Sequence, residues 1–186
     1  PLAEQAAHPL AFYQGLRLVA MDGSNFELPD EPDNIEQFGY PGSRTGQAGY
    51  PQAQCAVLIE CATHAILAAN IDSYRASEWS VCEPLLGRMD SSMLCLADRG
   101  FNGFEYWRKA QATGAQLLWR CANNRQLPAI ELLPDGSYLS EIHPPKRAVS
   151  SAEHTSDNLP AMEPITVRVI EYAMPGLPEG GSLATV

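Results

Sequence analysis

The sequence predicts a mixed α/β domain, in which a sheet of antiparallel and parallel strands carries helices on its faces. Three observations predict it. Short apolar segments with strand character open the chain, a segment with helical spacing follows, and the two kinds then alternate up to residue 121. Strands joined by short links run antiparallel, whereas strands joined through a helix run parallel. The expected order is therefore three strands, helix, strand, helix and strand.

The first strand and the loop after it have distinct compositions. Residues 16–21 are apolar on both faces apart from Arg17, which is typical of a central buried strand. Asp22 begins an Asp-Gly turn that ends this strand. Residues 23–51 are rich in Gly, Pro, Asp and Asn, so we expect a long loop there, with one short helix around 34–38.

A hairpin and a helix come next. Residues 53–60 and 64–74 are predicted to pair antiparallel, because only a short link separates them. The helix after them has two candidate N-caps, Ser77 and Ser80, of which Ser80 fits a capping box with Glu83. Its apolar face is formed by residues at helical spacing, namely Trp79, Cys82, Leu86 and Met89.

The core prediction closes with strand, helix and strand. Residues 93–97 are apolar on both faces. Asn102 is the expected N-cap of a helix over 103–113, in which Trp107 faces inward. Core packing is also preferred over base stacking for Trp79. Residues 115–121 are then the fifth strand.

The composition changes after about residue 125. Residues 129–133 and 137–142 are predicted to form a hairpin around a Pro-Asp-Gly turn. A mobile loop is expected over 143–164, and a strand exposed on one face over 166–172. Residues 175–186 are rich in Pro and Gly, and no element is predicted there.

Charge and composition restrict the function classes. The net charge of −10 argues against a dedicated nucleic-acid-binding domain, which is usually basic. No apolar run is long enough to span a bilayer, so we expect no membrane partner and a cytoplasmic protein. The five cysteines form no Cys-x-x-Cys pair and lie in apolar segments, which favours buried free thiols in a reducing compartment.

Asp22 and Asp98 are the strongest candidates for chemistry. Each is the first acidic residue after a buried strand, and each is followed by a glycine within two residues. Carboxylates at the carboxyl ends of neighbouring strands lie at the edge where α/β sheets bind ligands, and their oxygens suit hard divalent cations. The alternative is that both residues only end strands, because Asp and Gly favour turns.

Several segments resemble the IS4-family transposases of bacterial insertion sequences, a family of DDE-type transposases. They are 19–24 (VAMDGS), the Tyr74-Arg75-x-x-Glu78 spacing, 96–101 (LADRGF), 133–139 (LPDGSYL) and 167–172 (VRVIEY). The resemblance implies an RNase H-like mixed sheet flanked by helices, with a β-rich insertion after the fifth strand. It divides the chain into an upstream tail (1–15), the first part of a catalytic core (16–125), the insertion (126–174) and a Pro/Gly linker toward a missing C-terminal helix (175–186).

The resemblance also implies a site and a reaction. Asp22 and Asp98 would be two members of the catalytic Asp-Asp-Glu triad, binding Mg²⁺ or Mn²⁺ for cleavage and transfer of DNA strands by phosphoryl transfer. The third carboxylate lies on a later helix in that family, and neither Glu171 nor Glu179 is assigned that role. We therefore expect that the catalytic domain continues beyond this chain, and that the chain is inactive alone.

The implied partners are transposon-end and target DNA in a bacterial nucleoid, and a homodimer of the full-length protein is compatible with this picture. Arg99 and Arg44 are the candidate phosphate contacts, although Arg99 also suits a structural ion pair, and the Gly-rich loop around Arg44 lacks the features of a P-loop. For Glu78, next to a strand–helix junction, the alternatives are a residue that supports the site and a solvated first-turn glutamate, and the second is preferred.

Two rival interpretations stay open. In the first, the chain is an inactive transposase remnant that only binds DNA or protein. In the second, it is an unrelated small α/β domain in which Asp22 and Asp98 are turn residues.

Overall fold

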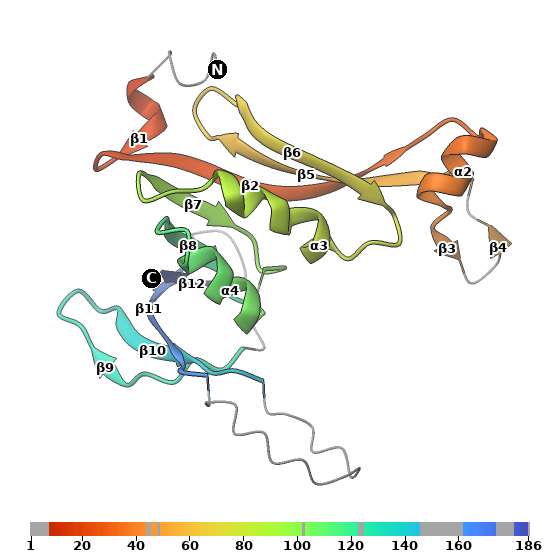
Figure 1. Ribbon diagram of the computed structural model, residues 1–186. Coiled ribbons are helices and arrows are strands. Elements are labelled where there is room, and N and C mark those ends of the chain that lie inside the picture. The colour runs from red at the N-terminus through yellow and green to blue at the C-terminus, as the bar shows by residue number, and fades with distance from the viewer. Residues whose placement is uncertain are drawn as a thin grey trace, which may run out of the picture.

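The computed structural model describes residues 8–43, 46–47, 49–101, 103–122, 125–145, 162–173 and 181–185. All but two of the strands in these ranges form one mixed sheet with the order β6-β5-β2-β7-β8-β12-β11-β10-β9, and β1 pairs with β2 outside this path (Figure 1). The strands are β1 (Phe12–Tyr13), β2 (Leu16–Glu27), β5 (Gln52–Glu60), β6 (Ile66–Ser73), β7 (Met93–Ala97), β8 (Gln116–Arg120), β9 (Glu131–Leu132), β10 (Tyr138–Ile142), β11 (Ile165–Tyr172) and β12 (Gly181–Thr185).

The helices are short. They are η1 (Pro9–Ala11), α2 (Pro32–Phe38), α3 (Glu78–Cys82), η2 (Glu83–Arg88) and α4 (Phe104–Gln111). A separate two-stranded ribbon is formed by β3 (Gly42–Ser43) and β4 (Gly46–Gln47).

The first half of the sheet has the predicted connectivity. β6, β5 and β2 form an antiparallel meander, and β2, β7 and β8 are parallel. The crossovers between the parallel strands contain α3 with η2, and then α4. The prediction of a mixed α/β sheet is thus confirmed.

The second half of the sheet is antiparallel throughout. β9, β10, β11 and β12 pair in sequence, and β12 also pairs with β8, so the β-rich part continues the same sheet. The expectation that 175–186 contains no element is wrong for 181–185, because β12 fills the space between β8 and β11 and a ladder on both sides overrides weak local preference. Of the loop predicted over 143–164, residues 146–161 lie outside the described residues.

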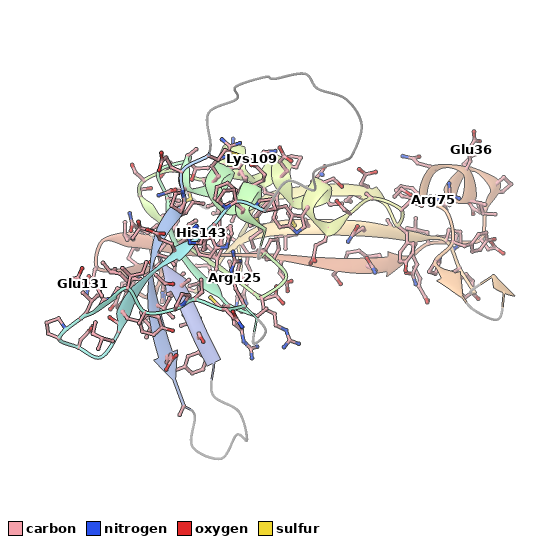
Figure 2. All side chains as sticks on the ribbon, turned by 90° about the horizontal axis from the view of Figure 1, so that it is seen from below. Glu36, Arg75, Lys109, Arg125, Glu131 and His143 are labelled. Atoms are coloured by element: carbon pink, nitrogen blue, oxygen red, sulfur yellow. The ribbon has the colours of Figure 1, made fainter. Side chains whose placement is uncertain are left out.

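β2 is longer than the sequence indicates. Residues 23–27 were expected in a loop, yet β2 runs on to Glu27, which pairs with Gln52 of β5. The strands β2, β5 and β6 therefore extend as an arm beyond the rest of the sheet, with α2 and the β3–β4 ribbon at its far end (Figure 1). Figure 2 shows Glu36 and Arg75 at this end of the arm, remote from Lys109 on α4.

Helices α3, η2 and α4 cover one face of the sheet and enclose the core (Figures 1 and 2). Trp107 and Trp119 are each 1% exposed, and their ring centroids lie 4.6 Å apart. Trp79 is half-buried and meets Tyr106 edge-on at 4.4 Å. The predicted inward packing of Trp79 and Trp107 is confirmed.

The α3–η2 segment shows how local chemistry sets an element. Ser77 is the N-cap, and its Oγ accepts from the Ser80 N–H at 3.1 Å, so the capping box on Ser80 is not used. The α-helix ends at Cys82 and a 3₁₀-helix continues from Glu83. Pro84 explains the change, because it has no N–H to donate to the carbonyl four residues earlier. Asn102, the predicted cap of the next helix, lies outside the described residues.

All five cysteines are free thiols. Cys82, Cys95 and Cys121 are buried as expected, and burial raises the pKa of Cys82 and of Cys95 to about 12. Cys55 and Cys61 are only half-buried. Within the described residues, no helix has the length and apolarity needed to cross a bilayer.

Candidate functional site

Asp22 and Asp98 lie side by side on neighbouring parallel strands. Met21 and Ala97 are the last register partners of β2 and β7, and each is followed directly by one of the two aspartates. Asp98 comes immediately after the end of β7. Asp22 lies within β2, at the point where this strand leaves β7 and continues along β5. The prediction that Asp22 ends its strand is therefore wrong, whereas its position beside Asp98 is as expected.

Backbone amides orient both carboxylates. The Gly23 N–H donates to Asp22 Oδ1 at 2.8 Å, and the Gly100 N–H donates to Asp98 Oδ1 at 2.6 Å. Both aspartates are exposed. The glycines in the Asp-Gly and Asp-Arg-Gly segments thus supply donors that hold the carboxylates at this edge of the sheet.

Glu78, the first residue of α3, brings a third carboxylate to the same edge. A side-chain carbon on Gly23 would lie 3.3 Å from Glu78 Oε1. A side-chain carbon on Gly100 would lie 3.3 Å from Glu78 Oε2 and 2.9 Å from Asp98 Oδ1. A side chain at position 23 or 100 would therefore crowd these carboxylate oxygens, which would have to shift.

The electrostatics of Glu78 reflect this position. Burial raises the pKa of the Glu78 carboxyl above its usual value, and the nearby charges of Asp98 and Asp22 raise it further. The interpretation of Glu78 as a solvated first-turn glutamate was therefore incomplete. Residue 78 is in the first turn, but it is half-buried and lies close to both aspartates. Its place in the Tyr-Arg-x-x-Glu segment, directly after the Ser77 cap, was the signal available in the sequence.

The carboxylate oxygens at this edge provide some, but not all, of the ligands that a hard divalent cation needs. Carboxylate oxygens are the ligands that Mg²⁺ prefers, and Mg²⁺ commonly uses one or two of them with water in the remaining positions. Asp22 and Asp98 bring two carboxylates to the same edge of the sheet. Over the described ranges, no group of three or more His, Cys, Asp or Glu side chains has the arrangement of a preformed metal site. Glu78 is therefore a neighbour of the two aspartates and does not complete a ligand set with them.

The other candidates lie as follows. Arg99 is exposed in the turn after β7, beside Asp98. Arg44 and Glu179 lie outside the described residues. Glu171 is on β11, separated from β7 by β8 and β12, and its Oε1 accepts from the Tyr138 hydroxyl at 3.1 Å. Glu171 is thus not brought to the candidate site.

Comparison with known proteins finds similarity to two transposases. The chain is 27% identical to the putative transposase InsZ of Escherichia coli (strain K12) over 136 residues. This aligned region covers 73% of this chain and 45% of InsZ. The chain is 30% identical to the transposase InsG for insertion sequence element IS4 of the same organism over 95 residues. This aligned region covers 51% of this chain and 22% of InsG. The chain is similar to bacterial insertion-sequence transposases. This confirms the resemblance seen in the sequence.

These transposases are much longer than the matched region, because the chain spans less than half the length of either relative. No protein-family model matches the chain. Among solved structures, a piggyBac transposase synaptic complex with hairpin DNA has a TM-score of 0.41 and 7% identity, covering 69% of this chain and 30% of that one. This likeness is too weak to carry an argument.

Proposed function

We propose that the chain is part of the catalytic domain of an insertion-sequence transposase, in which Asp22 and Asp98 bind a divalent cation for phosphoryl transfer on DNA. The observation that carries the proposal is the register of β2 and β7, which sets the two aspartates directly after a pair of partner residues. The similarity to InsZ and InsG supports the same reaction class.

The strand connectivity supports an RNase H-like core. Three antiparallel strands, β6, β5 and β2, are followed in the sheet by β7 and β8, which run parallel to β2. In this proposal the antiparallel strands β9 to β11 belong to the β-rich insertion that follows the fifth strand of the core.

The chain's own residues position and tune the site. The carboxylates of Asp22 and Asp98 would hold Mg²⁺ or Mn²⁺, and the N–H groups of Gly23 and Gly100 fix their orientation. A cation bound there supplies positive charge to the phosphate oxygens as charge develops on them. Glu78 adds negative charge next to both ligands, which favours a cation at this edge.

We infer that the complete site needs residues beyond this chain. Two carboxylates account for one cation with few protein ligands, whereas a two-metal mechanism requires a further carboxylate. The described residues also leave one face of the sheet without a helix. Half-buried leucines on that face, Leu18, Leu94, Leu96 and Leu118, belong to parallel strands, which are normally covered on both faces. The greater length of InsZ and InsG leaves room for both features.

Direct measurement of Mn²⁺ binding tests the proposed site. Titration calorimetry of the chain with Mn²⁺ should give saturable binding, and Asp98→Asn should weaken it at least tenfold, because the variant removes a charged oxygen ligand with little change in volume. Glu141→Gln, a change in β10 away from this edge, is the matched control. Binding that Asp98→Asn leaves unchanged would refute the assignment and favour a domain in which both aspartates are turn residues.

A further inference from the structure

A third side chain continues the row formed by Asp22 and Asp98. Ala97 of β7 is the register partner of Met21 on one side and of Trp119 on the other. The next residues on these three parallel strands are Asp22, Asp98 and Arg120. Because neighbouring strands lie about 5 Å apart, the backbone of Arg120 lies next to the backbone of Asp98.

The direction of the Arg120 side chain follows from the alternation along the strands. Met21 and Trp119 are 2% and 1% exposed beneath the helices. Successive side chains of a strand point to opposite faces, so Asp22 and Arg120 share the face that no described helix covers. Both residues are exposed. On its other side β8 pairs with β12, where Leu183 is the partner of Arg120.

Among the described residues, the guanidinium of Arg120 has no hydrogen-bond or ion-pair partner. Arg17, Arg108 and Arg168 form ion pairs with Glu60, Glu105 and Asp135. Arg120 is thus exposed, has no partner within the described ranges, and lies next to two candidate cation ligands, so this edge has the mixed charge expected where a phosphate binds.

The chemistry of the edge fits a phosphodiester. The two non-bridging oxygens of a DNA phosphate can be recognised at the same time by a cation on the carboxylates and by a guanidinium beside them. The planar fork of arginine donates two parallel hydrogen bonds to phosphate oxygens and keeps its charge at all physiological pH values. From this arrangement we propose that Arg120 is a positioning residue that binds the backbone phosphate of the DNA strand lying against Asp22 and Asp98. This inference rests on the proposed function.

The test measures DNA binding and metal binding separately. Fluorescence anisotropy with a labelled short duplex DNA, in Mn²⁺ and at several salt concentrations, gives the affinity and its salt dependence. Arg120→Gln should weaken binding about tenfold, since a hydrogen bond to a charged group is lost. It should also reduce the slope of log affinity against log salt by about one. Arg120→Lys should recover part of the affinity, because the charge is kept and the fork is lost.

A control variant and a separate measurement of Mn²⁺ binding distinguish a failure of this inference from a failure of the proposed function. Arg108→Gln, on α4 on the helical face, removes the same charge away from this edge and should leave the DNA affinity near that of the parent chain. Mn²⁺ binding should persist in Arg120→Gln and fall in Asp98→Asn. Equal DNA affinity and salt slope in Arg120→Gln and the parent chain, or no DNA binding by the parent chain, would overturn the role of Arg120. Mn²⁺ binding that Asp98→Asn leaves unchanged would instead overturn the proposed metal site.

Discussion

The carboxylate of Glu78 couples the charge of the candidate site to the stability of the fold. Its carboxylate lies in the space left by Gly23 and Gly100, and its pKa is raised by burial and by the charges of Asp98 and Asp22. A carboxyl whose pKa is higher in the folded than in the unfolded chain binds more protons when folded. The folded state is therefore favoured at low pH, and that advantage is lost as the pH rises from the usual glutamate value through the raised one.

The first prediction concerns Glu78→Gln, which removes the repelled charge and keeps the volume. Without divalent cations, the variant should be more stable than the parent at pH 7 by about 0.5 kcal/mol, a modest value because Glu78 is only partly buried. At a pH below the usual glutamate pKa, the parent and the variant should have the same stability. Urea denaturation at several pH values in EDTA checks this. A variant that is less stable than the parent at pH 7 would mean that Glu78 has a favourable partner.

The thiols give a second prediction at the residue scale. Burial raises the pKa of Cys82 and Cys95 to about 12, so these thiols are neither ionised nor accessible near neutral pH. Brief treatment of the native chain with iodoacetamide at pH 8 should modify Cys55 and Cys61 before Cys82, Cys95 and Cys121. Peptide mass spectrometry measures the order, and a sample in urea provides the fully reactive reference. Early labelling of Cys95 would show that the sheet core opens easily.

At the scale of elements, a buried ion pair joins the start of β2 to the end of β5. Glu60 is 1% exposed, and its Oε1 lies 3.4 Å from Arg17 Nε. The Thr63 hydroxyl donates to the other carboxylate oxygen. Arg17→Met should destabilise the chain by about 3 kcal/mol, because it leaves a buried carboxylate without its cation. Urea denaturation measures the free energy of unfolding of both variants. The double variant Arg17→Met with Glu60→Leu should recover most of the loss. An Arg17→Met variant as stable as the parent would show that the ion pair contributes nothing to stability.

The cap of α3 gives a second prediction for an element. The Ser77 Oγ accepts the Ser80 N–H, whereas the Ser80 Oγ donates to the Ser77 carbonyl within the first turn. Ser77→Ala should therefore cost about 1 kcal/mol, and Ser80→Ala only a few tenths. Thermal unfolding of both variants distinguishes them. The reverse ranking would restore the capping box on Ser80 that the sequence had indicated.

Individual elements show what the sequence could predict and what it could not. The two-sided apolar segments 16–21 and 93–97 predicted neighbouring central strands, and this was enough to bring Asp22 and Asp98 together. The extension of β2 over 23–27 was missed, because its polar, Gly-containing residues are held by pairing with β5 and not by their own preference. β12 was missed for the same reason. The position of Arg120 beside Asp98 could not be predicted from the sequence, because it depends on the register of β7 and β8.

At the scale of the whole molecule, the net charge opposes the binding of DNA. The net charge is −10, yet the edge that carries Asp22 and Asp98 also carries Arg99 and Arg120 next to them in the chain or in register. A mostly acidic surface repels DNA at long range, so binding by this chain alone should be weak and strongly dependent on salt. The cation proposed to bind the two aspartates would neutralise part of the negative charge at this edge. Metal and DNA should therefore bind cooperatively here.

The last prediction is that the chain alone does not cleave or join DNA. In the proposed site two aspartates would hold one cation with few protein ligands, and the described residues contain no group of three or more possible metal ligands. Losing one element of electrostatic stabilisation typically costs on the order of 10²–10³ in rate, and the loss of a whole cation should cost more. The assay is metal-dependent nicking of transposon-end DNA by the purified chain, with Asp98→Ala beside it. Nicking that Asp98→Ala abolishes would show that every required ligand lies within these 186 residues.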